Sequence, residues 1–316
     1  MPPLGLRALA AVFGALAGLR RSLYAIGLLP RMHLPVPVIV VGNIAVGGTG
    51  KTPLTVALVE ALRERGFKPG VVSRGYGGSA REPVLLDANT LPELAGDEAC
   101  LIHRATSAVV AVGRNRAAAA RLLLGKGDVD VIVADDGLQH YRLRRDAEIC
   151  VIDGERRFGN GRLLPAGPLR EPLARLACVD FRVCNGGQPQ PGEVPMGLTG
   201  DTAVSLSDSA RTRPLREFAG QRAHAVAGIG NPQRFFVQLR ALGIAVVEHS
   251  FPDHHAFVAV DLAFGDDAPV LMTEKDAVKC AGFAQATWWS VPVRTELPES
   301  FFDAVVARIA KHPRPR

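Results

Sequence analysis

The stretch Val38-Ile-Val-Val-Gly-Asn-Ile-Ala-Val-Gly-Gly-Thr-Gly-Lys-Thr52 decides the fold that the sequence predicts. Its apolar, β-branched beginning is typical of a buried strand, and the glycines that follow indicate a tight turn. Lys51 and Thr52 then open a helical pattern. The turn is similar to the phosphate-loop consensus G-x-x-x-x-G-K-[S/T], with Ala45 at the place of the first glycine. Strand, glycine loop and helix in this order predict an α/β protein that binds phosphate groups.

The chemistry of this loop predicts ATP and Mg²⁺ as ligands. Backbone N–H groups of the loop and of the helix start can surround phosphate oxygens. Lys51 would neutralise the β- and γ-phosphates, and the Thr52 hydroxyl would bind Mg²⁺. The expected nucleotide-binding residues are Ala45, Val46, Gly47, Gly48, Thr49, Gly50, Lys51 and Thr52.

Short Val/Ile-rich runs alternate with helical stretches along the chain, which predicts a mostly parallel sheet covered on both faces. The expected strands are 36–43, 70–73, 108–113, 130–134, 149–153 and 181–184, and then 223–228, 244–249 and 270–273 in a second series. The expected helices are 53–65, 114–124, 232–242 and 298–311. We expect a P-loop NTPase-like core at 34–185, preceded by a helical segment at 1–33. A smaller α/β domain with a turn-rich linker would occupy 186–294, and the helix in 295–316 would pack back on the core.

Residues 4–29 predict one apolar helix. The uncharged run 8–19 has 12 residues, short of the roughly 20 that span a bilayer. Arg7, Gly14, Gly18 and Arg21 fall on one side of the helix, and most of the remaining circumference is apolar. This pattern favours an amphipathic helix that lies in a membrane interface. Two alternatives are a helix buried against the protein's own core and a cleaved signal peptide.

Three acidic clusters lie where the predicted strands and helices meet. Asp135 and Asp136 end a hydrophobic strand, which is the form of a Walker B element. Gly96-Asp97-Glu98 opens a helix, and Asp253-His254-His255 follows a strand and a turn. Because parallel strands bring their carboxyl ends to one edge, we expect the first cluster to lie near Lys51. Thr273-Glu-Lys-Asp276 is only superficially like a guanine-reading element, since its lysine stands one place late.

Charge and cysteine content narrow the class of protein. The chain has 37 Lys and Arg against 31 Asp and Glu, and residues 1–59 contain five basic residues and no acid. That local excess favours lipid headgroups and ATP over nucleic acid as partners. Five dispersed cysteines without C-x-x-C spacing indicate a reducing compartment. The charged fraction of 22% and abundant aliphatic residues exclude a disordered chain.

Together these motifs resemble the tetraacyldisaccharide 4′-kinase (lipid A 4′-kinase) family. The matching stretches are GNIAVGGTGKTP (42–53), SRGYGG (73–78), GDE (96–98), DDGLQH (135–140), LLPAGPLREP (163–172), GIGNPQRFF (228–236), FPDHH (251–255) and TEKDAVK (273–279). They follow the family's order over most of the chain. The resemblance implies transfer of the γ-phosphate of ATP to the 4′-hydroxyl of an acylated glucosamine disaccharide 1-phosphate, on the cytoplasmic side of the bacterial inner membrane.

The resemblance also implies roles for individual residues. Asp97 would be the catalytic base, with His254 or His255 as its partner, and Asp135 and Asp136 would hold Mg²⁺ or orient the base. The implied catalytic set is Asp97, His254, Lys51 and Asp136, and the implied metal set is Thr52, Asp135, Asp136 and Glu171. No nucleic acid or obligate protein partner is implied. Two other functions remain open at this point: a P-loop kinase or ATPase for a soluble small molecule, and a nucleotide-switched membrane scaffold.

Overall fold

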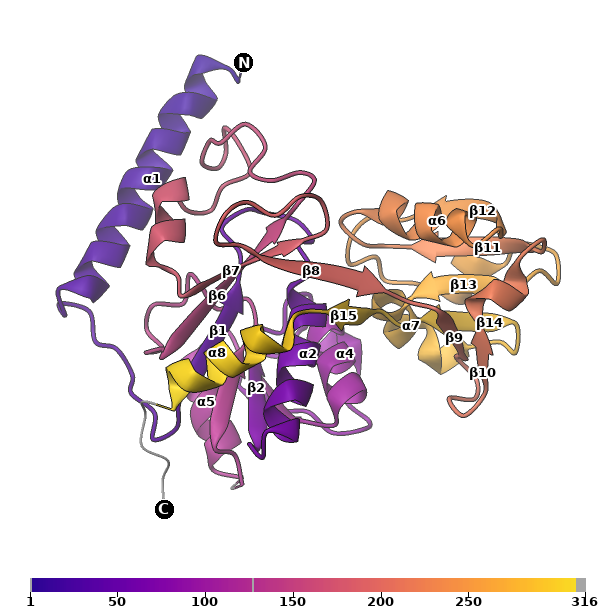
Figure 1. The fold of residues 1–316 in the computed structure, drawn as a ribbon, viewed down its shortest axis with the longest axis horizontal. Coiled ribbons are helices and arrows are strands. Elements are labelled where there is room, and N and C mark those ends of the chain that lie inside the picture. Colours follow the sequence, from indigo (N-terminus) through magenta and orange to yellow (C-terminus); the bar gives the residue numbers. More distant parts are fainter. Residues whose placement is uncertain (1, 127, 311–316) are drawn as a thin grey trace.

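The computed structural model describes residues 2–126 and 128–310, which form two α/β lobes (Figure 1). The larger lobe is built on a nine-stranded sheet whose inner strands are parallel. Its strands are, in spatial order, β15 (Arg294–Glu296), β8 (Val194–Thr199), β7 (Phe181–Asn185), β6 (Ala147–Asp153), β1 (Val38–Gly42), β5 (Val131–Ala134), β2 (Pro69–Ser73), β4 (Val109–Val112) and β3 (Val84–Leu85). Only β15 and β3, at the two edges, run antiparallel to their neighbours.

The smaller lobe is a six-stranded sheet with α6 (Pro232–Ala241) and α7 (Glu274–Cys280). Its strands are, in spatial order, β10 (Thr212–Pro214), β9 (Thr202–Ser205), β14 (Trp288–Val291), β13 (Val270–Thr273), β11 (Arg222–Ala227) and β12 (Ala245–Ser250). The chain passes from one lobe to the other after β8 and returns before β15, so these two paired strands form the connection (Figure 1).

Helices cover both faces of the larger sheet. One face packs against α2 (Lys51–Glu64), α4 (Asp97–Thr106) and α8 (Glu299–Ile309), and the other against α5 (Arg116–Leu124). A single turn, α3 (Pro92–Ala95), precedes α4, and short 3-10 segments lie at Leu173–Cys178, Leu215–Phe218, Ala259–Leu262 and Ala281–Phe283. The side chains between these layers are almost all aliphatic, as expected for strands buried on both faces.

The fold class predicted from the sequence is confirmed, and the predicted strands agree within about two residues with the observed ones. The turn-rich linker predicted from residue 186 is wrong in part, because that segment contains β8, β9 and β10. Strand β8 is stabilised by pairing with β7 on one side and β15 on the other. Such long-range pairing leaves little trace in a local pattern. The predicted domain limits stay predictions, although β8 belongs to the larger sheet. Lys311, the expected last residue of the final helix, lies outside the described residues.

The amino-terminal helix α1 (Leu4–Ala25) lies along the outside of the larger lobe (Figure 1). It ends at Ala25, four residues earlier than predicted. Ala10 and Tyr24 are buried on its inner side, and a Cβ at Gly14 would lie 2.6 Å from the Leu163 side chain. The side predicted to carry Arg7, Gly14 and Arg21 therefore includes the contact with the protein. No helix among the described residues is long and apolar enough to cross a membrane.

Candidate active site

The loop after β1 is held open by hydrogen bonds from both sides. Gly50, with φ at +90°, directly precedes Lys51, the first residue of α2. The Asn43 amide donates to Thr49 Oγ1 at 3.1 Å, and the Asn185 amide donates to the Thr49 carbonyl at 3.0 Å. Lys51 and Thr52 begin α2, and their backbone N–H groups are available to bind phosphate oxygens.

A cavity of about 590 Å³ lies between this loop and the smaller lobe. Seven of the eight predicted nucleotide-binding residues line it, from Val46 to Thr52. Ala45 is buried behind the loop, where it pairs with Leu169. The smaller lobe contributes Gly230 and Arg234, which follow β11 and were not predicted as site residues. Residues of both lobes therefore enclose the cavity that the predicted nucleotide-binding loop lines.

Asp135 and Asp136 occupy different surroundings at the end of β5. Asp136 lies 3.7 Å from Lys51 Nζ and accepts hydrogen bonds from Arg170 at 3.1 and 3.2 Å. Burial raises the pKa of Asp136, but the charges of Lys51 and Arg170 outweigh it, so the net shift is downward. Asp135 is fully buried, and burial together with the charges of Glu98 and Asp136 raises its pKa to about 7. The surroundings therefore favour the ionised form of Asp136 and disfavour that of Asp135.

The predicted metal ligands are only partly brought together. Thr52 and Asp136 line the cavity, and Asp135 Oδ2 is buried without a hydrogen-bond partner. Glu171 instead accepts a hydrogen bond from Tyr141 at 2.7 Å and lies 3.1 Å from Arg175 Nε. Among the described residues, no group of three or more His, Cys, Asp or Glu side chains is arranged to hold a metal. The oxygen donors around Lys51 nevertheless fit the preferences of Mg²⁺.

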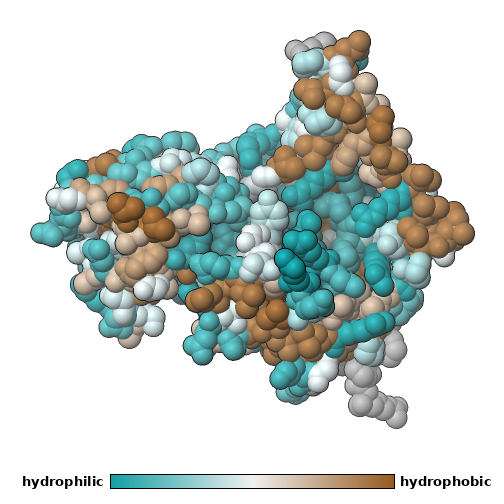
Figure 2. Space-filling model, turned by 180° about the vertical axis from the view of Figure 1, so that it is seen from behind, coloured by the Kyte–Doolittle hydropathy of each residue, from teal (hydrophilic) through white to brown (hydrophobic). Residues whose placement is uncertain are grey.

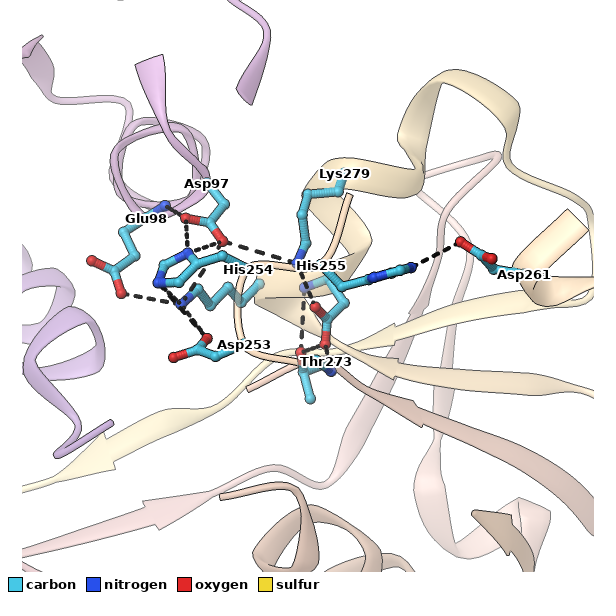
Figure 3. Close-up of polar contacts among 11 residues, drawn as sticks. Asp97, Glu98, Asp253, His254, His255, Asp261, Thr273 and Lys279 are labelled. Carbon is cyan, nitrogen blue, oxygen red and sulfur yellow. Dashed lines mark hydrogen bonds and ion pairs between the residues drawn. The ribbon is translucent and has the colours of Figure 1, made fainter. Parts of the chain in front are cut away.

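Asp97 begins α4, and the residue before it leaves no room for a side chain. Gly96 has φ at +86°, and a Cβ there would lie 2.4 Å from the Tyr76 carbonyl oxygen. His254 Nδ1 lies 3.0 and 3.1 Å from the two carboxylate oxygens of Asp97, so His254 reaches across from the smaller lobe (Figure 3). His255 points elsewhere and lies 2.9 Å from Asp261. The structure therefore places His254, and not His255, against Asp97.

Two lysines that sequence reasoning missed surround this pair. Lys275 Nζ lies 3.2 Å from Glu98, 3.1 Å from Asp253 and 3.8 Å from Asp97. Lys279 Nζ lies 3.9 Å from Asp97. Both belong to the TEKDAVK stretch and stand four residues apart on α7, so they share one face of that helix. This spacing was the available signal, but only the packing of α7 on α4 shows what the face contacts.

The surrounding cations determine the protonation state of Asp97. Burial raises the pKa of Asp97, but the hydrogen bond from His254 and the charge of Lys275 together bring it below its usual value. In return, the hydrogen bond to Asp97 raises the pKa of His254. Asp97 is thus an ionised, partly desolvated carboxylate at the start of a helix, a position that favours negative charge.

Comparison with known proteins identifies the family. The family described as "Tetraacyldisaccharide-1-P 4'-kinase" matches residues 3–310. The chain belongs to this family. The tetraacyldisaccharide 4'-kinase of Xanthomonas campestris pv. campestris (strain 8004) is 53% identical over 98% of this chain and 93% of its own length. The enzyme of the same name from Stenotrophomonas maltophilia (strain R551-3) is 53% identical over 98% and 94%.

A solved structure agrees with the family. The crystal structure of the "apo" form of LpxK from Aquifex aeolicus in complex with ATP is 28% identical, with a TM-score of 0.80 over 96% of this chain and 98% of that chain. The predicted family and the predicted enzyme class are therefore confirmed, and the chain is a kinase of the tetraacyldisaccharide 4'-kinase family. Neither a soluble-substrate kinase nor a scaffold is supported by these relatives.

Proposed function

We propose that this kinase transfers the γ-phosphate of ATP to the 4′-hydroxyl of a tetraacylated glucosamine disaccharide 1-phosphate, a step of lipid A formation. The observation that carries the proposal is the Asp97–His254 pair, which stands beside the cavity that begins at the phosphate loop. The names of the relatives and the ATP in the Aquifex aeolicus structure support the same reaction. A pair of this kind is what a hydroxyl acceptor requires, because an alcohol is a weak nucleophile until its proton is removed.

In the proposed reaction, Asp97 accepts the proton of the 4′-hydroxyl. As the sugar oxygen forms its bond to the γ-phosphorus, the bond from that phosphorus to the β-γ bridging oxygen breaks and ADP leaves. His254 donates its Nδ1–H to the carboxylate and holds it in one orientation. Because the pKa of Asp97 is lowered, the carboxylate is ready to accept a proton at neutral pH.

Lys51 and the amides at the start of α2 would hold the transferred phosphate. When Mg²⁺ is bound, it neutralises charge on the β- and γ-phosphate oxygens. We propose Thr52, Asp136 and Asp135 as the residues that hold it. Glu171 remains a candidate ligand, but it would first have to leave Tyr141 and Arg175.

Contacts between the lobes would exclude water from the transferred phosphate. Lys275 links Glu98 on α4 with Asp253 in the smaller lobe, at 3.2 and 3.1 Å. Gly230 of the smaller lobe also lies against Gly48 of the phosphate loop. A closed pair of lobes limits hydrolysis of ATP, which would otherwise compete with transfer to the sugar.

We propose that α1 attaches the enzyme to the cytoplasmic face of the bacterial inner membrane, where ATP and an acylated substrate are both accessible. Its outer side carries Leu9, Val12, Leu16 and Leu19, of which Leu16 is 62% and Leu19 57% exposed. Figure 2 shows this side as a hydrophobic band along the projecting helix. Such a band on a helix that does not span a bilayer suits peripheral, monotopic attachment. The proposal includes no nucleic acid and no obligate protein partner.

The reaction is tested by incubating the purified full chain with ATP, Mg²⁺ and tetraacyldisaccharide 1-phosphate in neutral detergent. We expect mass spectrometry to find one added phosphate on the disaccharide, and fragmentation to place it at the 4′ position. A lipid recovered without added phosphate would refute the proposed reaction.

The role of Asp97 is tested by Asp97→Asn, which keeps the shape of the side chain but removes its basicity. We expect kcat to fall about 100- to 10,000-fold, while ATP binding measured by calorimetry stays unchanged. Asp267→Asn, at an exposed position outside the cavity, serves as the control. Unaltered kcat in folded Asp97→Asn would exclude Asp97 as the base.

Membrane attachment is tested with the double substitution Leu16→Asp and Leu19→Asp. We expect the variant to stop sedimenting with vesicles that contain anionic lipid, because two charges would enter the apolar layer. Its kcat on substrate dispersed in detergent should not change, since neither side chain contacts the core. Continued sedimentation of the variant would show that another surface binds the membrane.

A further inference from the structure

His254 lies in a loop of the smaller lobe, residues 251–263, which follows β12 and which we call the His254 loop. The backbone of His254 has φ at +62°, in the left-handed region that is unfavourable for a residue with a side chain. Such a conformation persists only where the surrounding structure holds the chain in place. The contact of His254 with Asp97 therefore depends on what fixes this loop.

Four side chains hold the two ends of the His254 loop together. His249, on β12, stands before the loop, and Phe264 and Asp266 stand directly after it. The ring of Phe264 stacks on that of His249, with centroids 4.0 Å apart, and on that of His224 from β11, at 4.2 Å. His224 Nε2 also lies 3.0 Å from Asp266 Oδ1. These four residues, the loop clasp, close the loop at its base.

The His254 loop is packed around its own side chains. Phe251, His255 and Phe257 contact one another, with ring centroids 4.8 to 4.9 Å apart. His255 also lies 2.9 Å from Asp261 (Figure 3). Because compact loops of this kind are held together internally, the base of the loop determines where the whole loop lies, and His254 with it.

The loop clasp depends on its protonation state, because two imidazole rings face each other. His224 Nδ1 lies 2.8 Å from His249 Nε2, so the contact requires one proton, and only one, between these two nitrogens. The neutral pair and the pair with one added proton both meet this requirement, and in both the Nε2–H of His224 donates to Asp266. A second added proton would place two N–H groups against each other and break the contact.

Burial and the nearby charges determine at which pH the second proton is taken up. Burial lowers the pKa of His249, and the charge of His224 lowers it further. Asp266 is the acid beside His224, and Arg222 pairs with the same carboxylate at 2.6 Å. Because the closed loop disfavours the charged form of His249, its stability is full above about pH 6.5 and falls as the pH decreases below that value. The charged groups of the His254 loop and of α7 have other surroundings: His255 pairs with Asp261, Lys275 with Asp253 and Lys279 with Asp276, and Glu274 lines the cavity.

We propose that His224 and His249 are positioning residues for phosphoryl transfer, and that they act by closing the loop that places His254 against Asp97. The inference rests on the proposed function, in which the Asp97–His254 pair activates the acceptor hydroxyl. When the loop clasp takes up a second proton, the loop opens at its base more often, and the left-handed conformation of His254 is no longer held. Both histidines lie outside the cavity between the lobes, so they act on kcat from a distance.

The loop clasp is tested by amide hydrogen exchange of the full chain, with mass spectrometry of peptides from residues 251–263. After correction for the intrinsic exchange rate, protection of these amides should fall between pH 7.5 and pH 5.5. The fall should be about tenfold if the pKa of His249 differs by one between the closed and the open loop. His249→Gln should reduce this pH dependence, because the amide can donate to His224 but takes up no proton.

His33→Gln, which changes an exposed histidine of the larger lobe, serves as the control for the exchange experiment. It should keep the pH dependence of the unaltered chain. Protection that changes with pH to the same extent in the unaltered chain and in His249→Gln would overturn the proton-dependent loop clasp.

The positioning role is tested at pH 7.5 with Phe264→Ala, which removes the ring that both histidines contact. We expect kcat with the tetraacyldisaccharide 1-phosphate to fall about tenfold, because His254 is displaced. The KM for ATP should change little, since the phosphate loop and Gly230 lie outside the loop clasp. Phe264→Tyr keeps the ring and should keep kcat, and Phe264→Leu serves if Phe264→Ala does not fold. A rise in the KM for ATP as large as the fall in kcat would indicate a general disruption of the smaller lobe and overturn the positioning role.

The two experiments separate this inference from the proposed function, because hydrogen exchange needs no turnover. If the unaltered chain does not phosphorylate the disaccharide, the proposed function fails, and the exchange result still decides whether the loop clasp depends on protons. If the unaltered chain is active and Phe264→Ala keeps its full kcat, the reaction stands and only the positioning role is refuted.

Discussion

Two arginines in the larger lobe are almost equally buried but have different surroundings. Arg175 is 4% exposed and Arg116 is 6% exposed. Arg175 Nη2 lies 2.6 Å from both carboxylate oxygens of Glu148, and its Nε lies 3.1 Å from Glu171. Arg116 donates one hydrogen bond to a carbonyl and forms no ion pair within the described residues. Two acidic side chains of the protein form ion pairs with Arg175. No acidic side chain of the described residues does so with Arg116.

The difference shows how a buried charge can reveal its role. Burial lowers the pKa of Arg175, but its hydrogen bonds to Glu148 outweigh burial and the net shift is upward. For Arg116 burial dominates, and the pKa falls to about 10. A side chain whose charge is matched inside the fold contributes to structure. A buried charge that lacks such a match is costly to the fold.

The largest effect that tests this contrast is expected for Arg175→Met. The substitution keeps the apolar stem but removes the ion pair of the buried Glu171, while Glu148 keeps only its ion pair with Arg145. We expect the free energy of unfolding in urea at pH 7 to fall by about 3–5 kcal/mol. Proteins of this kind have a total stability of only about 5–15 kcal/mol, so the loss should also be visible as a lower midpoint.

A double variant checks that the loss comes from unmatched carboxylates. Adding Glu171→Gln to Arg175→Met removes the buried acid that has lost its ion-pair partner, and part of the lost stability should return. Arg182→Met, a partly exposed arginine of the same lobe, controls for the loss of one positive charge. If Arg175→Met were as stable as the unaltered chain, the interpretation of Arg175 as a structural residue would be wrong.

Local sequence patterns were sufficient to predict most of the strands and helices of the fold. The phosphate loop is a continuous strand, turn and helix, so each part of it is visible in the sequence near Lys51. Strand β8 was not visible, because its partners β7 and β15 make it a strand, and β15 lies almost a hundred residues away in the chain. Predictions failed where the conformation depends on such distant partners.

The candidate site was predictable to a similar extent. The motifs predicted Asp97 as a site residue with either His254 or His255 as its partner. Only the positions of the side chains show that His254 contacts Asp97. Lys275 was missed for the same reason, since its contacts with Glu98 and Asp253 form only when α7 packs on α4. Residue type and spacing indicate which chemical groups are available. The packing of the lobes determines which of these groups contact one another.

The second test concerns the charged side chains around Asp97, which we propose as the catalytic base. Lys275 and His254 lower the pKa of Asp97 against the effect of burial. Lys275→Met removes one of these contributions, so the pKa of Asp97 should rise. Because the base must be ionised, activity should then be lost at a higher pH as the solution is acidified. We expect the acid limb of the kcat/KM profile to move up by about one pH unit.

The pH profile distinguishes an electrostatic role of Lys275 from a purely structural one. Lys275→Arg keeps the positive charge and should keep the acid limb near its original position, even if kcat falls because the guanidinium has a different shape. A uniform loss of activity at all pH values in Lys275→Met would contradict the electrostatic role. It would leave Lys275 only as a link between Glu98 and Asp253.

The smallest effect is expected for the free energy of unfolding of Arg116→Met. This variant tests most directly the contrast between Arg116 and Arg175. This substitution leaves no acid without a partner and removes a buried charge, so the free energy of unfolding should change by less than about 1 kcal/mol. A loss as large as that of Arg175→Met would show that the charge of Arg116 is matched within the fold after all.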